Sequence, residues 1–269
     1  MLQASSTNVN ISRPAGHLSR AIADRRLCPC GVRPRDAVRV LLAVERRIAP
    51  PLVTGVAWAI TAAMAAWQVA DPSVLDALRR DPAALGRGEW WRVLSPLLVQ
   101  SDGWAQIVAN LVFLAVIGYF AERRFGRARW LVLYLTGGIV GEVAGYAFEP
   151  HGAGNSVAIF GLVGGLLAAA ARDRDDVSPV AVVAGLAWIA SVVGLDLGGY
   201  VWAAVASSLV VVLATQVARR LPDPSRLYLP AAALAAVLAV LLIAIADDHG
   251  APILAGLAVG ALMTPRKGA

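Results

Sequence analysis

Long apolar runs separated by short polar segments dominate the chain after residue 51. A helix that crosses a membrane needs about 20 apolar residues, and eight runs are candidates, the fourth and the last being short. They are Leu52–Ala70, Trp104–Ala121, Trp130–Phe148, Ser156–Ala171, Val177–Leu195, Tyr200–Val217, Tyr228–Ala246 and His249–Met263. The pattern predicts an all-α fold, a polytopic membrane helix bundle of about eight transmembrane spans within residues 52–264.

The two ends of the chain are polar. Residues 1–33 contain no apolar run and lack the features of a signal peptide. Residues 34–49 mix apolar side chains with arginines, which is typical of an amphipathic helix on an anionic membrane surface. We therefore predict a basic cytoplasmic tail at 1–51 with a juxtamembrane amphipathic helix, and a short cytoplasmic tail at 265–269.

The composition excludes two classes of protein. The 269 residues are 58% hydrophobic and 16% charged, whereas a soluble domain carries about 25% charged residues, so a soluble enzyme is excluded. Two cysteines, Cys28 and Cys30, cannot form the disulfide framework of a small secreted domain. They are also too close together, and without a second pair, for a zinc ribbon, so we expect no bound metal.

The distribution of charge predicts the membrane topology. Residues 1–51 hold nine arginines and three acids, which account for the whole net charge of +6. Because the basic residues border apolar runs, they indicate topology rather than a nucleic-acid partner. With the N-terminus in the cytoplasm and alternating spans, 20 of the 24 basic residues lie on the inner side.

The unequal distribution of basic residues between the two sides predicts a multi-pass protein of the cell's inner (plasma) membrane with a cytoplasmic N-terminus. The outer segments then hold four arginines beside nine acids. Removing an adjacent pair of spans would preserve the split, so it supports the orientation more strongly than the number of spans.

Polar residues inside membrane spans are costly and are candidates for function. Ser156 begins the fourth predicted span, where it is also a favoured helix cap, and His249 begins the last, where it is also compatible with a water-exposed loop. Gln106 and Asn110 lie one turn apart and can donate N–H groups or join helices. Glu142 lies inside the third span and must be neutral or paired, in a structural or a functional role.

The predicted topology places Ser156, His249, Gln106 and Asn110 at the outer ends of their spans. A nucleophile, a base and amide donors at one depth are the parts of an acyl-transfer site.

With these residues the sequence resembles a rhomboid intramembrane serine protease, over residues 52–171 and again over 228–264. The resemblance is carried by five motifs, in the same order and spacing: Gly88-Glu89-Trp90-Trp91-Arg92, Gln106-Ile107-Val108-Ala109-Asn110, Glu122-Arg123-Arg124-Phe125-Gly126, Gly154-Asn155-Ser156-Val157, and His249 followed by Gly256 and Gly260.

The resemblance implies a rhomboid-like transmembrane domain with a Ser156–His249 dyad that lacks an aspartate. It implies that the backbone N–H of Ser156, Asn110 and Gln106 hold the oxyanion and that Phe160 stacks under the histidine. Gly154, Gly256, Gly260, Trp91, Arg92 and Glu142 are expected in supporting roles.

The sequence departs from the family's pattern at three motif positions. Gln106 replaces a histidine, and Val157 and Pro252 replace glycines, so Val157 adds bulk where the helices that carry Ser156 and His249 are expected to meet. Three predicted spans, rather than one, also separate Ser156 from His249. An alternative alignment puts Tyr200 at the histidine position, with Ala203 and Ser207 at glycine positions, and makes the protein inactive.

The expected function is an intramembrane serine endopeptidase that cleaves single-span membrane proteins near the outer face. The alternative is a catalytically inactive rhomboid-like protein that binds transmembrane helices. Since the sequence contains no phosphate loop and no cluster of metal ligands, we expect no cofactor. The expected partners are the lipid bilayer and transmembrane-helix substrates. The resemblance specifies neither a natural substrate nor an oligomeric state.

Overall fold

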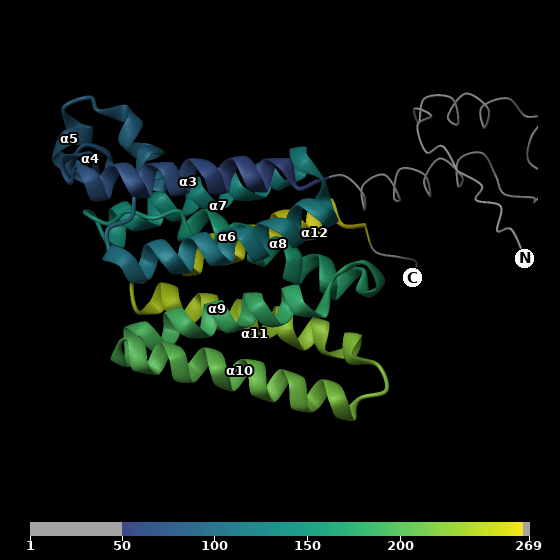
Figure 1. Ribbon diagram of the computed structural model, residues 1–269. Coiled ribbons are helices and arrows are strands. Elements are labelled where there is room, and N and C mark those ends of the chain that lie inside the picture. Colours follow the sequence, from purple (N-terminus) through teal and green to yellow (C-terminus); the bar gives the residue numbers. More distant parts are fainter. Residues whose placement is uncertain (1–49, 266–269) are drawn as a thin grey trace, which may run out of the picture. The chain divides into compact units, whose positions relative to one another are not determined.

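The computed structural model describes residues 50–265, and every regular element in this part of the chain is helical (Figure 1). The eight longest helices are α3 (Leu52–Ala70), α6 (Gly103–Phe125), α7 (Arg127–Phe148), α8 (Ser156–Arg172), α9 (Pro179–Gly198), α10 (Tyr200–Arg220), α11 (Tyr228–Ala244) and α12 (Gly250–Met263). Each begins and ends within four residues of one predicted apolar run. The predicted helical bundle is therefore confirmed.

Six helices among the described residues are long and apolar enough to cross a membrane. The two others, α8 and α12, have 17 and 14 residues. At about 1.5 Å per residue, both are shorter than a hydrocarbon core of about 30 Å. The number of eight spans therefore stays a prediction, whereas a multi-pass membrane protein is established.

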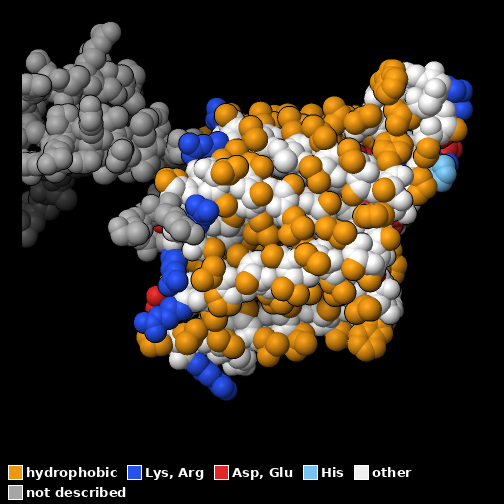
Figure 2. Space-filling model, turned by 180° about the vertical axis from the view of Figure 1, so that it is seen from behind, with side chains coloured by type: hydrophobic (Ala, Val, Ile, Leu, Met, Phe, Trp, Pro, Cys, Tyr) orange, Lys and Arg blue, Asp and Glu red, His pale blue; other side chains and the backbone are white. Residues whose placement is uncertain are grey.

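The surface of the bundle is suited to lipid. Apolar side chains cover the flanks of the helices, and most of the visible Lys and Arg side chains gather at one end (Figure 2). The described arginines that the topology prediction assigned to the inner side include Arg123 and Arg124 of α6, Arg172 of α8, and Arg219 and Arg220 of α10, all in the last turns of their helices. The predicted juxtamembrane helix at 34–49, Cys28, Cys30 and residues 266–269 lie outside the described residues.

Helix α8 forms the centre of the bundle, and its residues from Ser156 to Ala170 are all buried. Its glycines allow this. A Cβ atom added to Gly161 would lie 2.7 Å from Cα of Gly137 on α7, and one added to Gly164 would meet the backbone carbonyl of Ile253 on α12. Small residues therefore let α7 and α12 approach the backbone of α8 from two sides.

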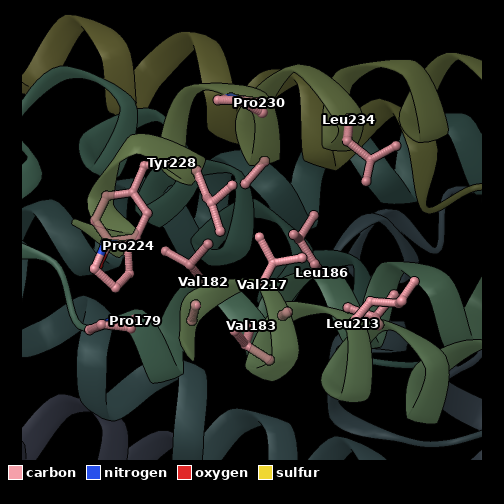
Figure 3. Close-up of a pocket in the computed structure, with 15 residues that line it drawn as sticks. Pro179, Val182, Val183, Leu186, Leu213, Val217, Pro224, Tyr228, Pro230 and Leu234 are labelled. Carbon is pink, nitrogen blue, oxygen red and sulfur yellow. The ribbon is translucent and has the colours of Figure 1, made fainter. Parts of the chain in front are cut away.

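Helices α9, α10 and α11 complete the bundle beside this core (Figure 1). Helix α10 has no buried residue. A cavity of about 300 Å³ between these three helices is lined by aliphatic side chains and by Tyr228 (Figure 3). The Tyr228 hydroxyl donates a hydrogen bond to the backbone carbonyl of Val177 at 3.2 Å. This cavity therefore offers apolar surface rather than groups for catalysis.

The segment between α3 and α6 folds into four short helices, which the sequence did not predict: α4 (Ser73–Leu78), α5 (Pro82–Gly86), η1 (Trp90–Val93) and η2 (Ser95–Leu98). Arg92 is buried and donates to the carbonyls of Asp76 and Arg79 at 3.0 and 2.8 Å, whereas Trp91 is exposed. Arg92 therefore holds this segment together, and neither residue lines the cavity around Ser156.

Candidate active site

A second cavity, of about 320 Å³, lies where one end of α6, α8, α9 and α10 meets the turn before α12. Its walls contain the four polar residues that the sequence placed at one depth, which are Ser156, His249, Gln106 and Asn110. The structure thus brings together side chains from two helices, α6 and α8, and from the turn before α12, which are far apart in the sequence.

Ser156 is the first residue of α8, and Asn155 occupies the N-cap position. The hypothesis that Ser156 itself caps the helix is therefore wrong. Asn155 makes no cap hydrogen bond; instead, its amide donates to the Thr61 hydroxyl at 3.1 Å and ties α8 to α3. Among the described residues, the backbone N–H groups of Ser156, Val157 and Ala158 have no hydrogen-bond partner, as at any helix start without a cap.

His249 faces Ser156 from the turn before α12. Its Nε2 atom lies 2.9 Å from Oγ of Ser156, which is hydrogen-bond distance. Ser156 is 7% exposed, and the His249 side chain is 19% exposed, so the pair is shielded but reachable from the cavity. Tyr200 lines the same cavity but is 62% exposed, so the alternative in which Tyr200 takes the place of the histidine does not fit this geometry.

Aromatic rings of α8, α9 and α6 pack in a row that ends at the His249 ring. Phe160, one turn after Ser156 on α8, contacts the imidazole edge-on, with ring centroids 5.1 Å apart. Phe160 stacks on Trp188 of α9, which in turn stacks on Phe113 of α6. The sequence identified Phe160 but missed Trp188, because nothing in the sequence places α9 beside α8.

The two predicted oxyanion donors line the cavity, but each amide already has protein partners. Asn110 donates to Oε1 of Gln100 at 2.6 Å. Gln106 donates to the backbone carbonyl of Ala153 at 3.1 Å, and a Cβ atom added to Gly154 would lie 2.6 Å from its Nε2. Gly154 therefore makes room for Gln106. An amide group has two N–H donors, so each residue keeps one for another acceptor.

A buried network of amides, which the sequence analysis missed, lies behind these donors. Gln100 donates to Oδ1 of Asn155 at 3.2 Å and exchanges two hydrogen bonds of 2.8 Å with Gln68 on α3, using its backbone N–H and C=O. Both glutamines are buried. The only feature of the sequence that could have indicated this network is the presence of Gln68 and Gln100 in or beside apolar runs. The network fixes the start of α8 and the position of Asn110.

The two departures from glycine are accommodated by the packing. Val157 packs with Leu97 and Tyr134, and a Cβ atom added to Gly141 on α7 would meet its side chain. The expectation that Val157 adds bulk between α8 and α12 is therefore wrong, because a glycine of α7 makes the space. Pro252 is buried in the first turn of α12, where a missing N–H costs no intrahelical hydrogen bond.

Gly256 and Gly260 lie against α8, where added Cβ atoms would meet the carbonyl of Gly161 and the Cα atom of Gly165. We expect Gly256→Ala to destabilise the protein by about 1–3 kcal/mol, because α12 must move away from α8. Gly55 on α3 has open space around it, so Gly55→Ala should be neutral or stabilising by up to about 1 kcal/mol. Denaturant unfolding in detergent micelles measures both, and equal effects would contradict this account of the packing.

Glu142 is fully buried and pairs with Arg80, whose Nη1 lies 3.3 Å from its Oε2. Arg80 is itself buried and reaches Asp248, with Nη2 2.8 Å from Oδ2, and Glu149 at 3.7 Å. Its Nε donates to the Glu149 backbone carbonyl at 3.0 Å. Glu142 is thus paired within the protein and does not line the cavity. The sequence missed Arg80, which it counted only as a charge in an outer loop.

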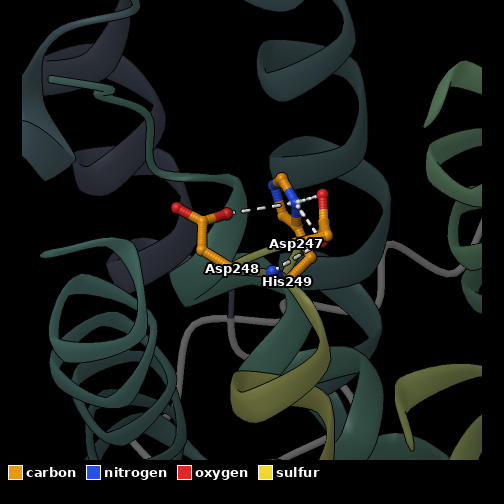
Figure 4. Close-up of side chains that lie close together, drawn as sticks. All are labelled: Asp247, Asp248 and His249. Carbon is orange, nitrogen blue, oxygen red and sulfur yellow. Dashed lines mark hydrogen bonds and ion pairs between the residues drawn. The ribbon is translucent and has the colours of Figure 1, made fainter. Parts of the chain in front are cut away.

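The carboxylates of Asp247 and Asp248 lie on either side of the His249 ring (Figure 4). Nδ1 lies 3.1 Å from Oδ1 of Asp247 and 3.2 Å from Oδ1 of Asp248. Burial disfavours the protonated ring, but the two carboxylates outweigh burial and raise the pKa of His249 above its ordinary value. His249 also lowers the pKa of Asp247, although burial of that carboxyl acts in the opposite direction.

Among the described residues, Asp247, Asp248 and His249 form the group whose possible ligand atoms lie close enough together to hold a metal ion. Protein partners already account for their donor atoms, because Asp248 pairs with Arg80 and Nε2 of His249 faces Ser156. The arrangement is explained without a metal, and a site without cofactors stays our prediction.

Comparison with known proteins identifies similar chains. Residues 87–218 match the family model of the Rhomboid domain, a stretch that includes Ser156, Gln106 and Asn110 and ends before His249. Rhomboid protease GluP of Bacillus subtilis is 38% identical over 96 residues, which cover 35% of this chain and 19% of that protein. Putative rhomboid protease YdcA of the same organism is 37% identical over 84 residues, covering 30% and 41%.

Rhomboid-like protease 3 of Toxoplasma gondii is 34% identical over 87 residues, which cover 32% of this chain and 33% of that protein. The chain thus spans less than half the length of each of these three relatives.

Proposed function

The chain belongs to the rhomboid family of membrane proteins, and from this premise we propose that it is an intramembrane serine endopeptidase. Ser156 is the nucleophile and His249 the general base. The observation that carries the proposal is the 2.9 Å contact between Oγ of Ser156 and Nε2 of His249 inside a cavity. The base, His249, lies outside residues 87–218, the stretch that matches the family model.

The chemistry follows the usual course of acyl transfer. Oγ of Ser156 attacks the carbonyl carbon of a peptide bond while Nε2 of His249 takes the hydroxyl proton. His249 then gives this proton to the leaving nitrogen as the C–N bond breaks, which leaves an acyl group on Ser156. Water, deprotonated by His249, attacks the acyl carbon and releases the second product.

The oxyanion of the tetrahedral intermediates is held at the start of α8. The unpaired backbone N–H groups there and the positive end of the helix dipole favour negative charge. The free amide N–H groups of Asn110 and Gln106 on the cavity wall supply further donors. Gln106 carries no positive charge, so it stabilises the oxyanion less than a protonated histidine would.

The substrates are single-span membrane proteins cut near the outer face. The cavity lies at the N-terminal ends of α6, α8 and α10, whereas the arginines of these helices lie in their last turns, at the opposite end. The positive-inside rule assigns the arginine-bearing ends to the cytoplasm. The N-terminus is then cytoplasmic, and the membrane is the inner (plasma) membrane. Residues 1–51 act as a cytoplasmic tail, and residues 52–264 form the catalytic domain.

A second candidate is an inactive rhomboid-like protein that binds transmembrane helices. One observation favours it: the family match ends at residue 218, so His249 has no counterpart within the matched stretch.

The test reconstitutes the full chain in proteoliposomes with a single-span substrate protein. We expect cleavage near the outer end of the substrate's membrane segment. A fluorophosphonate probe should form one adduct, which mass spectrometry locates on Ser156. Ser191 and Ser207 line the same cavity, but their hydroxyls donate to carbonyls of their own helices, so they should stay unlabelled.

Substrate that stays intact yet co-purifies with the protein, together with an unlabelled Ser156, would contradict the protease and support the binding protein. Cleavage with a labelled Ser156 would exclude that second candidate.

A further inference from the structure

The two ring nitrogens of His249 have different partners, and this determines what the ring can do. Nε2 faces Oγ of Ser156 at 2.9 Å, and Nδ1 faces Oδ1 and Oδ2 of Asp247 at 3.1 and 3.3 Å. A neutral imidazole that donates Nδ1–H to a carboxylate must leave Nε2 free to accept a proton. This is the arrangement of a Ser–His–Asp triad, whereas the sequence predicted a dyad.

Asp248 also lies near the ring but has another role. Its Oδ1 is 3.2 Å from Nδ1, whereas its Oδ2 pairs with the buried guanidinium of Arg80 at 2.8 Å. Asp247 has no arginine or lysine partner among the described contacts; its hydrogen bonds are to His249 and to the side chain of Asp196. The charge of Asp247 is therefore available to the imidazole, while Arg80 compensates that of Asp248.

The backbone holds Asp247 in this position. The backbone N–H of His249 donates to Oδ1 of Asp247 at 2.8 Å, and the N–H of Asp247 donates to the carbonyl of Leu242 at 2.9 Å. Ala246, just before Asp247, has φ of 64°, the only positive φ of a residue other than glycine among the described residues. This strained conformation turns the chain from α11 so that Asp247 lies behind the ring.

We infer that Asp247 is the positioning residue of the site: its carboxylate holds Nδ1–H of His249, so that Nε2 faces Ser156 and the imidazolium formed during attack is stabilised. The inference rests on the proposed protease function and completes its machinery as a triad. The aspartate does not touch the substrate and takes up no proton; it fixes the tautomer and the orientation of the base.

The test compares Asp247→Asn with wild type in the full chain. Asparagine can turn its amide N–H towards Nδ1 and so favour the wrong tautomer, which in a serine protease costs about 10⁴-fold in kcat. We expect kcat for a single-span substrate to fall at least ~10-fold with little change in KM. The acid limb of the pH profile should move to lower pH, because the ring loses a neighbouring negative charge.

The other charges that face His249 remain in this variant. They are Asp248, held by Arg80, Glu149, and Asp196, whose side chain hydrogen-bonds to that of Asp247 in the wild type. Asp71→Asn is the matched control, since Oδ1 of Asp71 accepts the backbone N–H of Ser73 two residues on in the same kind of turn, without a histidine. Asp71→Asn should leave kcat and the pH profile unchanged.

A second measurement does not depend on cleavage. The chain has three histidines, and ¹⁵N NMR of histidine-labelled protein, assigned with His151→Gln, follows the tautomer and titration of His249. In wild type Nδ1 should carry the proton of the neutral ring, and Asp247→Asn should lower the pKa and lose this preference.

An unchanged tautomer and titration in Asp247→Asn overturns the inference, whether or not wild type cleaves. Active wild type with an unshifted pH profile in the variant overturns it as well and leaves the protease intact. Inactive wild type with the expected NMR shift instead rejects the proposed function and keeps Asp247 as the partner of His249.

Discussion

Replacing Ser156 with alanine is expected to lower substrate cleavage by about 10⁴-fold or more, as removal of the nucleophile does in serine proteases. The two other serines on the cavity wall, Ser191 and Ser207, should not substitute, because their hydroxyls donate to carbonyls of their own helices. Oγ of Ser156 makes one hydrogen bond, to His249, so the variant should lose no more than about 1.5 kcal/mol of stability. Initial rates of product formation in proteoliposomes, at equal amounts of folded protein, measure the effect.

His249→Ala should reduce cleavage to a similar level, and the double variant should be no slower than either single one. Nucleophile and base act as a unit, so removing the second after the first costs nothing further. Ser73→Ala is the control, since this exposed serine bonds only Asp71 and should keep full activity. Cleavage by Ser156→Ala at the wild-type rate would contradict the assignment of the nucleophile.

The sequence was sufficient to predict the helices, because a membrane span must satisfy its backbone internally and must be apolar over a fixed length. These demands act on each run alone, so α3 coincides with its predicted run and the other helices lie close to theirs. The depth of Ser156, Gln106 and Asn110 followed from alternating the sides of the membrane. The sequence thus predicted a shared depth, and the structure adds that these residues line one cavity.

The partners within the site could not be predicted, because they depend on packing between distant helices. Trp188 lies under Phe160 only because α9 returns beside α8. The sequence shows two acids beside His249, but the left-handed conformation of Ala246 decides that Asp247 hydrogen-bonds to the ring. The sequence also could not show that the side chain of Val157 packs at Gly141 of α7 rather than between α8 and α12.

Arg80 links four parts of the chain near the turn that carries His249. From the segment before α5 it pairs with Glu142 on α7 and with Asp248 before α12, and it contacts Glu149 after α7. Cβ atoms added to Gly145 or Gly152 would meet its guanidinium, so glycines leave the space that it occupies. The side chains of Arg80, Glu142 and Asp248 are 2%, 0% and 4% exposed.

Arg80→Met should therefore destabilise the protein by about 3–5 kcal/mol, because two buried carboxylates lose their cation. Arg79→Met is the matched control: Arg79 is 40% exposed and pairs with an exposed Asp76, a contact worth at most about 1 kcal/mol. Denaturant unfolding in detergent micelles measures both variants. Adding Glu142→Gln to Arg80→Met should recover part of the loss, since it removes one stranded charge. Equal small effects of the two arginine variants would mean that the pairing of Asp248 with Arg80 does not fix the turn that carries His249.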